Sequence, residues 1–170
     1  MLKRSDIFIF IHGSDESAEK AFRLIYEEYS KLIRFVAGKY LEGEADVEDV
    51  AIDSFVALYE ARRNVKDVKY YLVTTCKNKA LNLLKKQKRE IYMESENFEN
   101  YAFGSREYSE IVGQIYAIAG KTDGDIVIGH VVEGYSLKEL ALRYGISLSA
   151  IKSRYRRCMA RLSSELEKRV

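Results

Sequence analysis

The stretch Ser136-Leu-Lys-Glu-Leu-Ala-Leu-Arg-Tyr-Gly-Ile-Ser147 carries the strongest local signals in this chain. Ser136 and Glu139 have the spacing at which a serine caps the first amides of a helix while the glutamate reaches back to the serine amide. We therefore expect a helix to begin at Leu137 and to end just before Gly145, which supplies a tight turn.

Ser147 can cap a second, longer helix that runs to about Lys168. Two helices joined by a short turn that contains glycine form a helix-turn-helix. Its small core should contain Leu140, Ala141, Leu142, Ile146, Leu148, Ile151 and Tyr155. The apolar residues of the second helix recur as one stripe, Leu148, Ile151, Tyr155, Cys158 and Leu162. This stripe leaves outward Ser149, Lys152, Ser153, Arg156 and Arg157.

The second helix is also strongly basic. Between Leu140 and Ser164 there are six cations and no acid: Arg143, Lys152, Arg154, Arg156, Arg157 and Arg161. Such groups donate hydrogen bonds to phosphates and base edges, so we predict that this helix binds DNA through Ser149, Lys152, Ser153, Arg154, Arg156 and Arg157. A solvated basic helix in an ordinary bundle is the alternative.

The rest of the chain also has helical periodicity. Helices are expected over about 18–41, 44–62 and 66–90, then a weak one over 106–119 and one opened by Thr122 and Asp125 as a capping box. The apolar segment 7–11 is interpreted as a packed N-terminal arm. We predict an all-α fold with two small helical domains, 1–90 and 108–170, joined by an acidic linker over 91–107.

These patterns resemble a known family. The segments 134–141 and 144–154 resemble the fourth conserved region of sigma-70 factors, especially the extracytoplasmic-function group, which reads the minus-35 promoter element. The segment 46–59 resembles the polymerase-binding helix of the second region, and 70–86 resembles its minus-10 recognition helix. The resemblance implies a sigma factor that binds core RNA polymerase and directs promoter recognition and transcription initiation through minus-10 and minus-35 contacts.

Seven acids and no base lie between Glu42 and Glu60. The resemblance implies that this negative face binds core RNA polymerase, with contacts from Asp46, Glu48, Asp49 and Asp53. A solvated helix face is the alternative for any one of these carboxylates.

The third expected helix mixes lysines with tyrosines, which suits unpaired DNA because bases stack on rings while cations follow phosphates. The resemblance adds a base-capturing loop over about 63–69, with Asn64 as a reader. We expect the minus-10 contacts to be Asn64, Lys69, Tyr70, Lys77, Asn78 and Lys85. Core packing is the alternative for Tyr70 and Tyr71, with Tyr71 the more inward of the two, and Asn78 can equally be a local structural hydrogen-bonder.

The composition argues against other classes. Net charge is only +2, and Cys76 and Cys158 form neither a zinc motif nor a disulfide framework, so we expect two packed, reduced thiols in a cytoplasmic protein. The sequence has no signature of a catalytic site, a metal site or a cofactor site. We therefore expect that the protein is not an enzyme and that it has no small-molecule substrate and no membrane partner. An anti-sigma factor remains open as a partner. Two rivals also stay open: a helix-turn-helix regulator that acts without a holoenzyme, and a protein-binding adaptor or anti-sigma-like protein.

Overall fold

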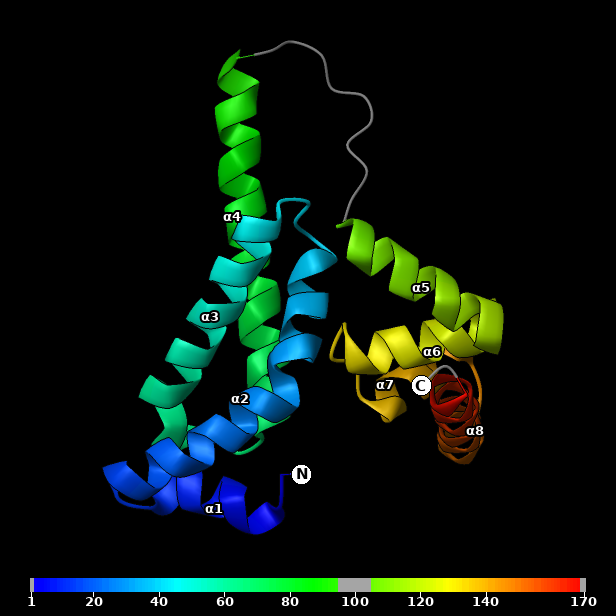
Figure 1. The fold of residues 1–170 in the computed structure, drawn as a ribbon. Helices are drawn as coiled ribbons and strands as arrows, with labels where there is room; N and C mark the ends of the chain where they lie inside the picture. The colour runs from blue at the N-terminus through cyan, green and yellow to red at the C-terminus, as the bar shows by residue number, and fades with distance from the viewer. Residues whose placement is uncertain (1, 95–104, 169–170) are drawn as a thin grey trace. The chain divides into compact units, whose positions relative to one another are not determined.

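A computed structural model describes residues 2–94 and 105–168 of the chain. Over these residues the fold is all-α, as predicted, with eight α-helices, one short 3-10 helix and no β-strand (Figure 1). The chain divides into two compact units, Met1–Ser105 and Arg106–Val170. The elements of the first unit are α1 (Arg4–His12), α2 (Asp15–Gly38), α3 (Glu44–Ala61), η1 (Arg62–Asn64) and α4 (Val68–Glu94). Those of the second are α5 (Arg106–Ala119), α6 (Lys121–Val131), α7 (Leu137–Tyr144) and α8 (Leu148–Glu167).

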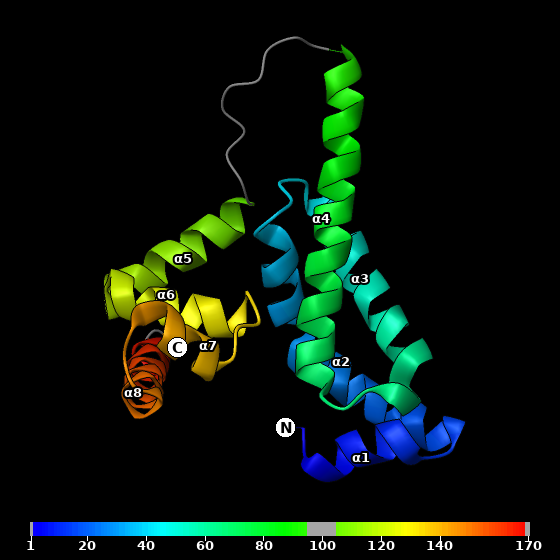
Figure 2. The same ribbon diagram turned by 180° about the vertical axis from the view of Figure 1, so that it is seen from behind.

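The first unit is a bundle of α2, α3 and α4, and the C-terminal part of α4 projects beyond the other two helices (Figure 2). Its core is fully buried at Ile25, Ile33, Leu58 and Leu72. The segment 7–11, predicted to be a packed arm, is the centre of α1, which packs on α2 and η1. It buries Phe10 and Ile11 and leaves Phe8 and Ile9 exposed.

The bounds of the helices in this unit differ from the predicted ones by a few residues, and α2 ends at Gly38, before the predicted Leu41. α3 ends within one residue of its predicted limit, whereas α2 begins at Asp15, earlier than predicted, because Ser14 caps it. α4 begins at Val68, and the Asp67 carboxylate accepts a hydrogen bond from the Tyr70 amide at 2.9 Å. α4 continues to Glu94 and α5 starts at Arg106, so most of the predicted linker, residues 95–104, lies outside the described residues.

The second unit packs its four helices around two small clusters. One contains Ile126, Leu140, Ala141 and Ile151, and the other contains Ala119, Val127 and Cys158. Leu142 and Leu148, both expected in this core, are 76% and 38% exposed, so those two predictions are wrong. An amphipathic helix buries one side only, and in α7 the residues on that side are Leu140 and Ala141.

The predicted capping box at Thr122 is also wrong. α6 begins at Lys121 and its N-cap is Gly120, whose φ of 74° suits glycine. Asp125 instead accepts a hydrogen bond from the Tyr116 hydroxyl at 2.7 Å, and burial with this bond raises the pKa of Tyr116 to about 12. A Cβ at Gly124 would lie 2.6 Å from the Tyr116 ring, so α5 and α6 can approach only because this position is glycine.

Both cysteines are free and buried, as expected of packed thiols. Burial raises the pKa of the Cys76 thiol to about 12, and the thiol lies 3.4 Å from the Ile33 carbonyl oxygen. A thiol in this environment is poorly reactive.

Candidate nucleic-acid and protein interfaces

The turn between α7 and α8 has the geometry that the sequence predicts. The Ser136 amide donates to Glu139 Oε2 at 2.7 Å, and the Glu139 amide donates to Ser136 Oγ at 3.2 Å, so the capping box is complete. These bonds from Ser136 lower the pKa of the exposed Glu139 carboxyl. Gly145 ends α7 in the left-handed region at φ 64°, and Ser147 Oγ caps α8 by accepting from the Ala150 amide at 3.2 Å. Local bonds therefore determine where α8 starts.

The apolar stripe of α8 then decides which side chains are exposed. Ile151 and Cys158 are fully buried, and this orientation exposes Ser149, Lys152, Arg156 and Arg157 as predicted. Ser153 is half-buried. The exposed face of α8 thus combines cations with a serine hydroxyl, the groups that contact phosphates and base edges. We call Ser149, Lys152, Arg156 and Arg157 the basic face.

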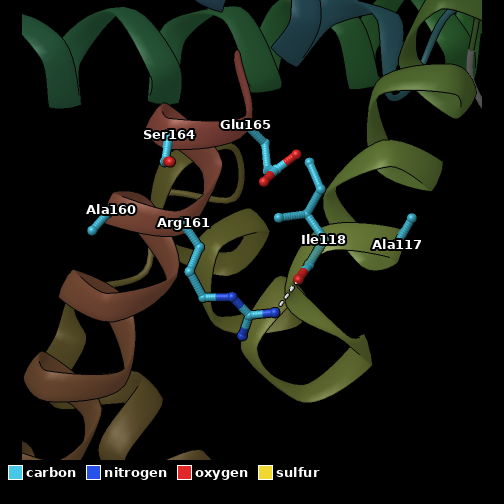
Figure 3. Close-up of a pocket in the computed structure, with 6 residues that line it drawn as sticks. All are labelled: Ala117, Ile118, Ala160, Arg161, Ser164 and Glu165. Atoms are coloured by element: carbon cyan, nitrogen blue, oxygen red, sulfur yellow. Dashed lines mark hydrogen bonds between the residues drawn. The ribbon is translucent and has the colours of Figure 1, made fainter. Parts of the chain in front are cut away.

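Two other arginines of α8 are engaged inside the unit. Arg154 Nε donates to Asp123 Oδ1 of α6 at 2.7 Å, and both side chains are partly buried. Arg161 donates to the carbonyl of Ile118, near the C-terminal end of α5, beside a surface hollow of about 480 Å³ (Figure 3). A cation at a helix C-terminus satisfies free carbonyls and favours the macrodipole. These two arginines bond α8 to α6 and α5. The sequence offered no means of telling them from the other cations of α8.

The acidic helix α3 has a mixed surface. Glu48 pairs with Arg34 at 2.6 Å, and Asp53 lies 3.5 Å from Lys79 Nζ. Asp46 is partly buried and accepts from Gln87 at 2.7 Å, whereas Asp49 is exposed. Of the four predicted acids, Asp49 and Asp53 are therefore the most accessible.

Sequence reasoning missed two apolar residues on the same side of α3. Ile52 is 44% exposed and Val56 is 49% exposed. They follow Asp49 at spacings of three and seven, so all of them lie on one helix face together with Asp53. The sequence signal for this face was the presence of Ile52 and Val56 at positions that the amphipathic pattern of the helix assigns to solvent. We call Asp49, Ile52, Asp53 and Val56 the acidic-apolar face.

On α4 the structure separates the two tyrosines as expected. Tyr70 is 60% exposed, whereas Tyr71 is half-buried and donates to the Ala57 carbonyl at 3.3 Å. Lys77, Asn78 and Lys85 follow Tyr70 at spacings of seven, eight and fifteen, which places them on one helix face. Lys69 is half-buried, and Asn64 is exposed at the end of η1, six residues before Tyr70.

Comparison with protein families matches residues 25–90 to Sigma-70 region 2 and residues 122–164 to Sigma-70, region 4. Together these matches cover more than half of the chain. The chain belongs to the sigma-70 family. It is a sigma factor, and its function is transcription initiation.

Comparison with solved structures finds the structure described as CnrH in complex with the cytosolic domain of CnrY. The identity is 20%, the match covers 99% of each chain, and the TM-score is 0.49. Comparison with curated protein sequences gives no match.

The matched regions contain the surfaces described above. In this sigma factor, the match to region 2 includes α3, η1 and α4 as far as residue 90. It therefore contains the acidic-apolar face, Asn64 and Tyr70. Region 4 includes α7 and the part of α8 that carries the basic face. α1 and the first turns of α2 lie before the match to region 2.

The part of the chain that the structure describes contains no group of three or more His, Cys, Asp or Glu side chains that could hold a metal ion. His130 contacts the Tyr135 carbonyl oxygen at 2.7 Å and the Tyr155 ring edge-on, so it packs within the second unit. In the same part of the chain, no helix has the length and apolar character needed to cross a membrane.

Proposed function

We propose that this sigma factor belongs to the extracytoplasmic-function group, binds core RNA polymerase and directs it to promoters by reading the minus-35 and minus-10 elements. The observation that carries the proposal is the basic face of α8, presented on a helix whose start and orientation are set by the Ser136–Glu139 box, Gly145 and the buried Ile151. Only residues 91–121 separate the two family matches, and this short spacing supports the assignment to the extracytoplasmic-function group.

For the minus-35 element, α8 enters the major groove of duplex DNA. Arg156 lies midway along the exposed face and reads a base edge, while Lys152 and Arg157 contact phosphates. Ser149 and Ser153 donate hydrogen bonds nearby. Arg154 contributes through its ion pair with Asp123, which holds α8 in place.

For core polymerase, the acidic-apolar face of α3 is the docking surface. Exposed apolar side chains bury area against a partner, and the carboxylates of Asp49 and Asp53 steer association with a basic surface. Asp46 and Glu48 support this face through Gln87 and Arg34.

For the minus-10 element, the exposed face of α4 binds the melted non-template strand. Tyr70 stacks on a base, Lys69, Lys77 and Lys85 follow the phosphates, Asn78 lies among them, and Asn64 reads a base edge from η1.

Reconstitution with core polymerase tests the proposal. We expect a stoichiometric complex and transcription from a promoter selected out of a genomic fragment library, without any other factor. A regulator that acts without a holoenzyme would bind promoter DNA by itself and form no stoichiometric complex. An adaptor would show no promoter binding even when polymerase is present.

A further inference from the structure

Arg62 stands out among the described charged side chains because it is buried, with 8% exposure. Its guanidinium donates to the Asp15 carboxylate at the start of α2 and lies 5.4 Å from the centre of the Tyr59 ring. Its Nε is buried without a hydrogen-bond partner among the described residues. Burial of an arginine is costly, so the ion pair with Asp15 and the Tyr59 ring must compensate for it.

Arg62 lies directly before the exposed residues of η1. Arg62 is the first residue of η1, and the next two residues, Arg63 and Asn64, are exposed. Val65 then returns to the core with 6% exposure. The exposed tip that carries Asn64 is therefore anchored on both sides, by the ion pair of Arg62 and by the buried Val65.

The support behind Arg62 comes from the N-terminal end of the chain. Phe10 of α1 is fully buried, and its ring lies 6.2 Å from the Tyr59 ring and 5.8 Å from the Phe22 ring. α1 also packs directly on η1. Phe10 and Asp15 both lie before residue 25, where the match to region 2 begins. We call α1 together with Asp15 the N-terminal brace.

We propose that the N-terminal brace positions the base-reading tip of η1, with Asp15 and Arg62 as positioning residues. This inference rests on the proposed role of Asn64 in reading the minus-10 strand. A reading group must be held by residues whose own side chains are fixed, because small displacements weaken directional hydrogen bonds. The Asp15–Arg62 pair fixes the backbone of η1 two residues before Asn64, and it connects that backbone to an element outside the family match.

The primary variant is Asp15→Asn, because the Asp15 side chain is 85% exposed and its replacement leaves the core intact. Glu16→Gln is the matched control, since Glu16 lies in the same first turn of α2 but pairs with Lys20 at 3.0 Å. Both variants remove one charge from the N-terminus of α2, so any effect of the helix macrodipole is common to them.

The holoenzyme of each variant is titrated with non-template minus-10 oligonucleotides that carry each of the four bases at each position in turn. We expect Asp15→Asn to reduce base preference at a single position by about threefold, the order of effect of a partly exposed ion pair. Glu16→Gln should leave the preference at every position unchanged. Arg62→Lys should retain part of the preference, and Asp15→Asn combined with Arg62→Met should lose no more than Arg62→Met alone.

The inference is overturned if Asp15→Asn keeps the wild-type preference at every position, or if the loss spreads equally over all positions. In either of these cases the wild-type holoenzyme still shows its preference, and the proposed function stands. A wild-type holoenzyme with no base preference at any minus-10 position would instead contradict the proposed role of Asn64, and the brace with it.

Discussion

The exposed faces of α3 and α8 are both charged helix surfaces, yet they are built for different partners. On α3 the side chains between the carboxylates are Ile52 and Val56, each more than two-fifths exposed. On α8 the side chains among the cations are serines, Ser149 and the half-buried Ser153, and Leu148 in the first turn is an exposed apolar residue. Apolar groups within a charged face suit a protein partner, because the centre of a protein interface excludes water and charge. Hydroxyls within a basic face suit nucleic acid, whose interface is polar and contains water.

The two faces also differ in how their charges are held. Glu48 and Asp53 of α3 have lysine or arginine partners on neighbouring helices, while Lys152, Arg156 and Arg157 of α8 lie exposed. The cations of α8 that do pair internally, Arg154 and Arg161, lie one turn before and one turn after Arg157, and all three line one surface hollow. The number of charges on each helix does not by itself separate a protein-binding face from a DNA-binding face.

The largest effect is expected at α3. Reversing Asp49 and Asp53 to lysine should weaken core polymerase binding by about 100-fold or more, because like charges across an interface cost several kcal/mol. Circular dichroism of the variant should remain normal, since both side chains are exposed. The control is Glu16→Lys with Glu19→Lys on α2, which makes the same change of charge at exposed positions. An unchanged complex at physiological salt would show that this face does not bind polymerase.

Replacing Ile52 and Val56 by serine tests the apolar part of the same face. Loss of exposed apolar area should weaken the complex to a similar extent at low and high salt, because salt screens charges and not apolar contacts. The charge reversal should instead depend on salt.

At α8, Arg156→Ala should cost about 1–3 kcal/mol of promoter binding and relax preference at one minus-35 position. Lys152→Ala should weaken binding on all sequences and lower the salt slope by about one. The measurement is a salt titration of the holoenzyme on matched and scrambled minus-35 duplexes. Ser164→Ala, exposed farther along α8, is the control and should have no effect. If Arg156 and Lys152 behave like Ser164, α8 does not read DNA.

Tyr70 tests a third kind of surface, where an exposed ring shares a helix face with Lys77 and Lys85. Tyr70→Ala should reduce the preference for single-stranded over duplex minus-10 DNA, with about 1–3 kcal/mol at stake for one stacked base. Tyr71→Phe removes the hydroxyl that bonds to Ala57 and should leave this preference unchanged. Equal binding of the wild-type holoenzyme to both forms of DNA would indicate general electrostatic attraction.

The smallest effect is expected at the internal flank of α8. Arg154→Ala should lower the free energy of unfolding of the second unit by about 0.5–1 kcal/mol, as for a partly exposed ion pair. It should leave the salt slope of promoter binding unchanged, in contrast to Lys152→Ala. Asp123→Asn should produce the same loss of stability, and the double variant should be no less stable than Arg154→Ala. A reduced salt slope for Arg154→Ala would move this arginine to the DNA-binding group.

Features of the chain that depend on short-range bonds were predicted correctly, whereas several that depend on tertiary packing were not. The start of α7, its end before Gly145 and the start of α8 were all predicted, because each depends on a bond between residues three or four positions apart. The predictions for Thr122, Leu142 and Leu148 were wrong. Near Thr122 the helix begins at Lys121 after Gly120, and the Asp125 carboxylate bonds to Tyr116 of the preceding helix. Leu142 follows the buried pair Leu140 and Ala141 and is exposed.

By itself, the sequence determined that the chain is all-α, where α7 and α8 meet, and which helices are acidic or basic. It could not distinguish Arg154, which pairs with a residue 31 positions away, from its exposed neighbour Arg156, nor reveal that Arg62 is buried against Asp15, 47 positions away. Caps and apolar stripes act within one helix, so residue spacing is enough to find them. Ion pairs between helices depend on how side chains from distant segments pack together, and only the tertiary structure decides that.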